Sequence, residues 1–193
     1  MQYKRDFEDH KKHKLLFSAI GRYFGKEQSS VFSNTLTSGT ETIPDQITAT
    51  DFNEGKFTFN LDYTKPFGTN WTLETGAQYL VNDVSNDFKV QNETADGEFI
   101  SDPNQTNLFE YDQNVLGVYA TGAYEGTVWG VKAGLRVENT DLKTLLVTTN
   151  DKNDTNFTNL FPSFHTSYKF SERISFQAGY CLLYTSPSPR DRG

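Results

Sequence analysis

Apolar and polar residues alternate along most of this chain, and this period of two restricts its fold more than any other feature. In the stretch KFTFNLDY, the apolar positions Phe57, Phe59, Leu61 and Tyr63 are separated by polar ones. Successive side chains of a β-strand point to opposite faces, so the pattern predicts strands with one apolar and one polar face. We predict about eight strands on this basis, near residues 2–8, 14–25, 56–63, 71–81, 109–119, 129–138, 164–170 and 174–180.

The alternation also assigns each side chain to a face. Charged residues in the centres of strands, such as Glu74, Lys132 and Arg136, fall on the polar face. The strand 109–119 is predicted to carry its aromatic and branched residues on the apolar face, namely Phe109, Tyr111, Val115 and Tyr119. The residues predicted to lie opposite them, on the polar face, are Glu110, Asp112 and Asn114.

The predicted connections alternate between short and long. Turns are expected at 9–14, 64–70, 124–127 and 171–173, where glycine, proline or charged residues interrupt the pattern. The other connections, 37–53, 83–106 and 140–156, are rich in Asn, Asp, Thr and Ser. No stretch requires a helix, so the sequence predicts an all-β, antiparallel, up-and-down sheet.

Composition and span distinguish a membrane sheet from a soluble sandwich, which also alternates. Only 35% of the residues are hydrophobic while 15% are aromatic, which is little material for a compact core and too aromatic for a disordered chain. From Trp71 to Tyr79, a strand tilted by about 40° rises ~21 Å, close to the ~25 Å apolar band of a membrane barrel. Together with the charged strand centres and the alternating connections, this span favours a transmembrane β-barrel over a soluble sandwich.

Charge and targeting features exclude other classes. The formal net charge of −7 does not favour nucleic acid, whose recognition needs basic patches. No apolar run is long enough for a transmembrane helix, and the polar N-terminal stretch MQYKRDFEDHKKHK is not a secretory signal. A single cysteine allows no internal disulfide.

Four motifs occur in a fixed order and carry a family resemblance. They are F-x-Y at Phe109 and Tyr111, G-L-R-x-E at 134–138, L-F-P-S at 160–163, and the preceding stretch LDYTKPFGTNWTLETGAQY. In this order they resemble the barrel of TonB-dependent outer-membrane receptors, in the group known as the outer membrane protein beta-barrel family. The resemblance covers roughly residues 1–180.

The resemblance implies a barrel of about 22 strands in the outer membrane of a Gram-negative bacterium. It further implies an N-terminal plug domain, contact with TonB, and import of a scarce nutrient such as a metal chelate or an oligosaccharide. Residues 1–180 are then a partial barrel of about eight strands, without the plug and without a true start at Met1. Two alternatives stay open: a non-transport outer-membrane barrel with a structural or adhesion role, and a small-barrel enzyme, which would need a catalytic set.

The end of the chain departs from the family pattern. The segment 181–193 begins with Cys181 and contains Pro187 and Pro189, and the alternation stops there. Its first residues, CLLYTSPSPRD, resemble the translation of a transposon-based sequencing adapter. We therefore interpret 181–193 as a non-native tail, the alternative being a natural proline-rich end.

Few residues suggest chemistry. His10 and His13 form an H-x-x-H pair in a lysine-rich turn, and we interpret both as solvated, because a metal pair needs further ligands. His165 shares the polar face with Lys169 and has no evident nucleophile or acid partner. The segment 150–156 has the Asp-x-Asn rhythm of a calcium loop but lacks its glycine and glutamate, so we interpret it as a surface loop.

The sequence thus predicts no catalytic residue, no metal site and no cofactor site. The charged residues of the polar face are interpreted as lining a hydrated lumen, with contact to a plug or ligand as the sharper alternative; they are Asp62, Glu74, Lys132, Arg136 and Glu138. Residues that bind a ligand are not identified individually. The long loops, including Phe99 and Ile100, are hypothesised to touch it, because binding sites favour loops held by a rigid frame.

Overall fold

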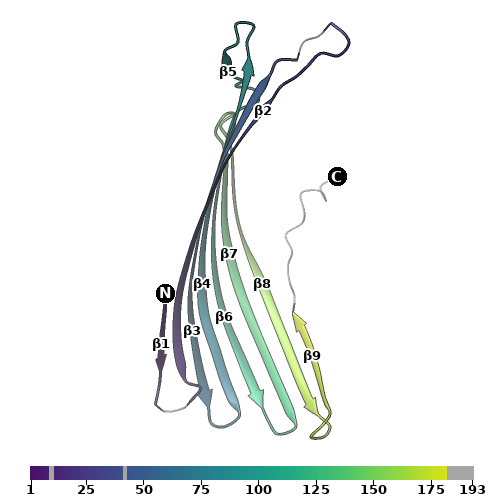
Figure 1. The fold of residues 1–193 in the computed structure, drawn as a ribbon. Helices are drawn as coiled ribbons and strands as arrows, with labels where there is room; N and C mark the ends of the chain where they lie inside the picture. The colour runs from purple at the N-terminus through teal and green to yellow at the C-terminus, as the bar shows by residue number, and fades with distance from the viewer. Residues whose placement is uncertain (9–10, 41–42, 182–193) are drawn as a thin grey trace.

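The computed structural model describes residues 1–8, 11–40 and 43–181, and every regular element in these ranges is a strand (Figure 1). No helix in the described ranges is long and apolar enough to cross a membrane. The strands are β1 (Gln2–Asp6), β2 (Lys14–Phe32), β3 (Gln46–Phe67), β4 (Trp71–Glu93), β5 (Phe99–Ser101), β6 (Asn107–Glu125), β7 (Trp129–Leu146), β8 (Asp151–Lys169) and β9 (Ser175–Cys181).

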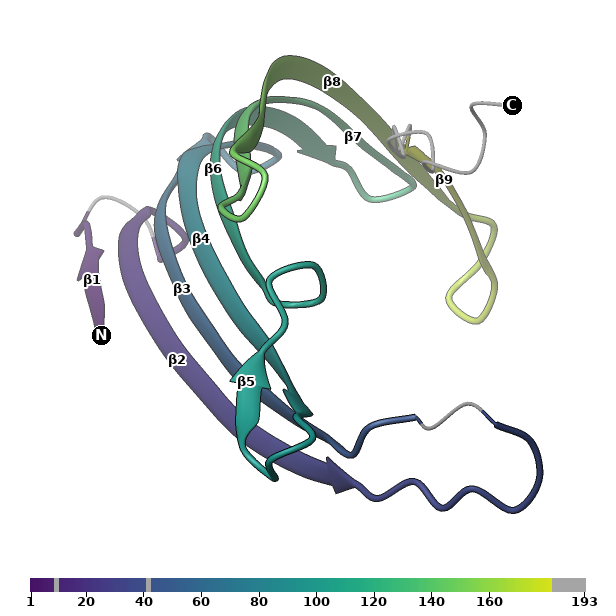
Figure 2. The same cartoon turned by 90° about the horizontal axis from the view of Figure 1, so that it is seen from above.

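The strands form one antiparallel sheet in up-and-down order, as the sequence predicts. The order is β1-β2-β3-β4-β6-β7-β8-β9, and the short β5 pairs with the upper end of β4. Seen from above, the sheet is an open arc with β1 and β9 at its two ends (Figure 2). The described strands therefore form a partial barrel.

The convex face of the arc carries the apolar residues. The register places Phe17 opposite Leu61 and Leu61 opposite Ala77. The same row continues through Val118, Val137 and Leu160. Six neighbouring strands therefore contribute one apolar side chain each at the same height.

These apolar side chains are not covered by a second layer. Leu61 is 45% exposed and Val118 is 46% exposed, while Val90 is the one fully buried large side chain among the described residues. A continuous exposed apolar face of this kind needs an apolar surrounding. Lipid supplies it, so the stability of the sheet depends on the membrane rather than on a packed core.

Aromatic rings mark the short-turn end of the apolar band. Trp71 of β4 packs on Tyr124 of β6 with ring centroids 5.0 Å apart, and Trp129 of β7 packs on Tyr168 of β8 at 4.8 Å. Such aromatic belts stand at the membrane–water interface of barrels. The short β3–β4 turn lies just beyond them, where Gly68 adopts a φ of 61° that favours glycine.

The concave face carries the polar residues. Side chains from five strands line one hollow on this face: Lys4, Lys14, Thr64, Glu74 and Lys132. The Lys12 ammonium, in the β1–β2 turn, reaches the Glu125 carboxylate at the end of β6, 3.6 Å away, although three strands lie between them. In a closed barrel this face lines the lumen.

All three predicted long loops are wrong in extent. The segments 46–53, 83–93 and 151–156 are strand, and so is 140–146. The connections are accordingly shorter, at 33–45, at 94–106 with β5 inside it, and at 147–150. Above the apolar band both faces of the wall meet water, so polar residues occur on both faces and the strict alternation that marks a strand disappears.

The predicted face of β6 is also wrong. Tyr119 lies opposite Gly76, between Glu74 and Gln78 on the polar face of β4, so Phe109, Tyr111, Val115 and Tyr119 all lie on the concave face. The convex face at this height carries Glu110, Asp112 and Asn114. These polar residues stand above the lipid, whereas the aromatic ones line the inside, so the polarity of the two faces is reversed there.

Candidate functional site

A chain of hydrogen bonds crosses the concave face at the height of the apolar band. Asn60 donates from Nδ2 to Ser18 Oγ at 3.2 Å, and Gln78 donates from Nε2 to Asn60 Oδ1 at 2.7 Å. Arg136 donates from Nη2 to Gln78 Oε1 at 2.9 Å and from Nε to Glu138 Oε1 at 2.5 Å. Four strands, β2, β3, β4 and β7, are joined by this chain.

Glycines allow long side chains to cross an intervening strand. The Arg136 guanidinium passes over Gly117 of β6, where a Cβ atom would lie 2.7 Å from its Cζ. The Tyr119 ring likewise passes over Gly76 of β4, and its hydroxyl donates to Asp62 Oδ1 of β3 at 2.5 Å. Both ties join strands that are not neighbours, so they fix the curvature of the sheet as well as its register.

A third tie crosses β6 nearer the short turns. Lys132 of β7 donates to Glu74 Oε2 of β4 at 2.6 Å. With it, the structure places on the concave face all five charged residues that the sequence assigns to the polar face, and each of them binds another residue of the wall: Asp62, Glu74, Lys132, Arg136 and Glu138. At this height the wall satisfies its own charges.

Two of the three histidines, His13 and His165, lie in the part of the chain that the structure describes. The His13 side chain is 7% exposed, stacks on Phe7 with centroids 4.1 Å apart and bonds the Tyr63 hydroxyl through Nε2 at 2.9 Å, so its interpretation as a solvated residue is wrong. The His13 ring packs between the aromatic rings of Phe7 and Tyr63 and is therefore shielded from water. His10 lies outside the described residues. His165 lies on the concave face against Gly179, where a Cβ would lie 2.5 Å from its Nδ1.

The segment 150–156 is neither a calcium loop nor a surface loop. Residues 151–156 belong to β8 and pair with β7, with Asp151 opposite Leu146 and Asn156 opposite Asp141. Strand geometry sends successive side chains to opposite faces, so these oxygens do not converge. No group of three metal-ligating side chains occurs among the residues that the structure describes.

Higher on the concave face, β2 and β3 bring cations and aromatic rings together. Arg22 lies opposite Lys56, and Lys26 lies opposite Phe52, which packs on Phe24 at 6.1 Å between centroids. The sequence alone does not predict this cluster. Arg22, Phe24 and Lys26 are alternate residues of one strand, so the sequence places them on the same face. Their proximity to Lys56 and Phe52 depends on the pairing of β2 with β3.

Tyr111 and the Lys89–Asp87 ion pair lie on opposite faces of the part of the wall above the apolar band. On the concave face, burial raises the pKa of the Tyr111 hydroxyl. On the convex face, the Lys89 ammonium lies 2.7 Å from the Asp87 carboxylate, whose hydrogen bond and charge raise the pKa of Lys89.

The predicted ligand-touching residues Phe99 and Ile100 lie in β5, paired with Glu93 and Asn92 of β4. Asp102, just after this strand, donates its backbone N–H to Val90 O and accepts from Asn92 Nδ2 at 3.1 Å. The Ile100 side chain is 58% exposed. This hairpin lies at the end of the sheet opposite the short turns (Figure 1). In an outer-membrane barrel the long loops at that end face the extracellular side.

A curved antiparallel sheet with a lipid-facing apolar convex face, an aromatic belt and a polar concave face defines a transmembrane β-barrel wall of the outer-membrane type. The sequence profile of the outer membrane protein beta-barrel family matches residues 5–185. The chain therefore belongs to this family, which places it in the outer membrane of a Gram-negative bacterium.

Solved structures give the same fold. Eleven chains match, and one of them is the ferric citrate transporter FecA in its unliganded form, with a TM-score of 0.55 and 12% sequence identity. The match covers 89% of this chain and 24% of the FecA chain. At this identity the likeness shows the fold alone. The comparison with curated protein sequences finds no match.

Proposed function

We propose that this chain is part of the barrel of a TonB-dependent outer-membrane receptor, a transporter rather than an enzyme. The observation that carries the proposal is the open arc. Eight strands in a row leave β1 and β9 unpaired with each other, and they correspond to 24% of a large transporter chain. Open sheet edges are not tolerated in lipid, so further strands, up to a total of about 22, complete the barrel.

The proposed mechanism divides the work among three parts. The wall spans the lipid and holds its curvature through the ties over Gly76 and Gly117. The outer hairpins and the outer concave face receive a scarce nutrient, either a metal chelate or an oligosaccharide. A plug domain within the same protein closes the lumen, and TonB opens it with energy from the proton-motive force.

Energy-dependent uptake tests this function. In cells that carry the complete protein, we expect a nutrient to accumulate only while the proton gradient is intact, and an uncoupler or loss of TonB to abolish uptake. The measurement is uptake of radiolabelled ferric citrate and of labelled maltohexaose with and without uncoupler. Passive entry of both solutes, unchanged by the uncoupler, would contradict the proposal, and unchanged uptake after deletion of the gene would favour a structural or adhesion role.

We also propose that residues 1–180 are barrel and 181–193 a non-native tail. Cys181 is the last residue of β9 and lies opposite Ser163, and 182–193 lie outside the described residues. A long read of the source DNA across both ends checks the assignment. We expect it to continue past Tyr180 without the sequence CLLYTSPSPRD; finding that sequence in the genome would refute the tail assignment.

A further inference from the structure

One lysine of an inner strand lies on the lipid-facing side of the sheet, close to the short turns. Lys65 of β3 shares the convex face with Tyr63 and Phe67 and lies opposite Leu73 of β4. Strands β2 and β4 flank β3 on its two sides, so every strand next to Lys65 is described. A charged side chain that faces lipid is destabilising unless it reaches the interface. The direction of the Lys65 side chain therefore decides its role.

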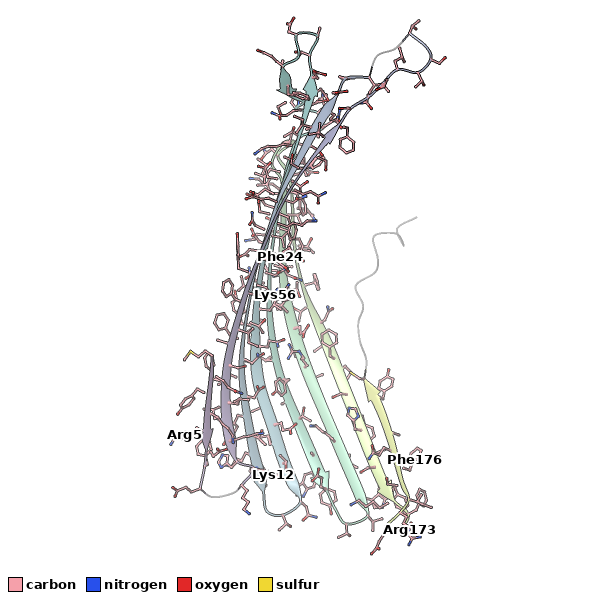
Figure 3. All side chains as sticks on the ribbon, in the orientation of Figure 1. Arg5, Lys12, Phe24, Lys56, Arg173 and Phe176 are labelled. Atoms are coloured by element: carbon pink, nitrogen blue, oxygen red, sulfur yellow. The ribbon has the colours of Figure 1, made fainter. Side chains whose placement is uncertain are left out.

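The Lys65 side chain bends toward the membrane surface. Its ammonium lies over the Phe67 ring, 5.3 Å from the centroid, and Phe67 is two residues nearer to the β3–β4 turn. The Arg5 guanidinium of β1 likewise lies over Phe7, with its Cζ 5.1 Å from the centroid, again on the turn side. Figure 3 shows Arg5 in the lower part of the sheet and Lys56 near mid-height. Both convex cations thus lie at the headgroup level of the leaflet beside the short turns.

No acidic side chain of the described wall balances Lys65. Among the described residues, the one charge contact of its ammonium is the Phe67 ring. From the short turns up to the height of Tyr79, the only charged side chains on the convex face of the described strands are Arg5 and Lys65. The charge of Lys65 is therefore available to an anion from the surroundings.

The convex face changes sign above the apolar band. Glu27, Asp51 and Asp87 form one cross-strand row, and Asp83 lies opposite Asp112 in another. A surface that is acidic above the band and cationic below it attracts anions at the short-turn end alone. Short turns of outer-membrane barrels face the periplasm, so the anion that fits Lys65 belongs to the periplasmic leaflet.

Two uncharged donors stand beside the ammonium. Phe67, Trp71 and Tyr124 form one row across β3, β4 and β6, in which neighbouring strands are about 4.8 Å apart. The Trp71 side chain is 58% exposed. Neither its indole N–H nor the Tyr124 hydroxyl bonds another described residue. One ammonium and two free donors, with no carboxylate beside them, match the oxygens of a phosphate.

We propose that Lys65, Trp71 and Tyr124 form a binding site for the headgroup of an anionic phospholipid of the periplasmic leaflet, of the class of phosphatidylglycerol. The lipid phosphate accepts from the ammonium and the indole, and the acyl chains lie along the apolar face above, which begins at Leu73. A zwitterionic headgroup carries its own cation, which the ammonium repels. The inference goes beyond the proposed function, because it concerns the surrounding lipid and not the nutrient.

Quenching of Trp71 fluorescence by brominated lipids tests the site in the complete protein. The protein is reconstituted in phosphatidylcholine vesicles that contain brominated phosphatidylglycerol or brominated phosphatidylcholine, and the Trp71 emission is the difference between the unmodified protein and Trp71→Phe. We expect phosphatidylglycerol to bind beside Trp71 about 5-fold more strongly than phosphatidylcholine, the ratio expected of one lysine near an anionic surface. Lys65→Gln should abolish this preference and Lys65→Arg should retain it.

Trp129 is the matched control within the same belt. It packs on Tyr168, and the neighbouring strands β6 and β8 carry no lysine on the convex face at this height. We expect no lipid preference at Trp129, measured by difference with Trp129→Phe, and a weaker preference at Trp71 in high salt. Quenching of Trp71 by brominated phosphatidylcholine should be the same in Lys65→Gln, which shows that the variant is folded in the bilayer. Equal binding of the two lipids at Trp71, a preference that survives Lys65→Gln, or an equal preference at Trp129 would overturn the assignment.

Discussion

Replacement of Gly76 by alanine is expected to destabilise the barrel by about 3 kcal/mol, at the upper end of the cost of overpacking. The new Cβ would lie 2.7 Å from Cε1 of the Tyr119 ring and would also collide with the backbone carbonyl of Leu61. A flexible side chain can move aside, but the carbonyl is fixed by the β3–β4 pairing. The strands must therefore separate or the ring must leave its slot, and the bond from Tyr119 to Asp62 is lost with it.

Urea-induced unfolding of the complete protein in lipid vesicles measures this effect. Gly122→Ala is the matched control, because Gly122 lies on β6 with no atom within 4 Å of the added Cβ. Tyr119→Phe isolates the hydrogen bond and should cost about 1.5–3 kcal/mol, the usual contribution of a bond to a charged group. Equal stability of the Gly76 and Gly122 variants would show that the ring does not occupy the slot over Gly76.

Replacement of Val118 by arginine is expected to cost about 2–4 kcal/mol, the penalty for an arginine facing lipid near the bilayer midplane. Val118 stands in the centre of the apolar row, opposite Ala77 on one side and Val137 on the other. Its side chain is 46% exposed on the convex face. Lipid offers no hydrogen-bond partners to the guanidinium, and mid-band is too deep for it to reach water easily.

Val115→Arg is the matched control for this variant. Val115 lies three residues earlier on the same strand and faces the lumen, opposite Leu80 of β4 and Thr140 of β7. Water hydrates a guanidinium there, so we expect a loss below ~1 kcal/mol. The same urea titration measures both variants. A cost for Val115→Arg as large as that for Val118→Arg would contradict the assignment of the two faces.

The fold of the apolar band was predictable because the thickness of the membrane sets how long the alternation between apolar and polar residues continues along each strand. Within the band one face meets lipid and the other meets water, so residues such as Phe59 and Asn60 must alternate in polarity. The four short turns and the antiparallel order followed from the same pattern. Above the band this constraint ends, so the pattern predicts loops where β3 begins at Gln46 and where β4 continues to Glu93.

The candidate site could not be predicted for a related reason. Ties such as Tyr119 to Asp62 and Arg136 to Gln78 join residues 57 and 58 positions apart. They depend on the register between strands and on a glycine in the strand between them. The same holds for the outer cluster, in which Arg22 meets Lys56 only because β2 pairs with β3 in one register.

The sequence by itself determined the class of the fold, the lipid-facing side of most strands and the family, because polarity along one strand is a local property set by the surrounding solvent. The tertiary structure alone decided which charges meet, which face of β6 lines the lumen, and where the wall is cationic. These depend on pairing between distant segments, and a shift of one residue in register would send each side chain to the other face.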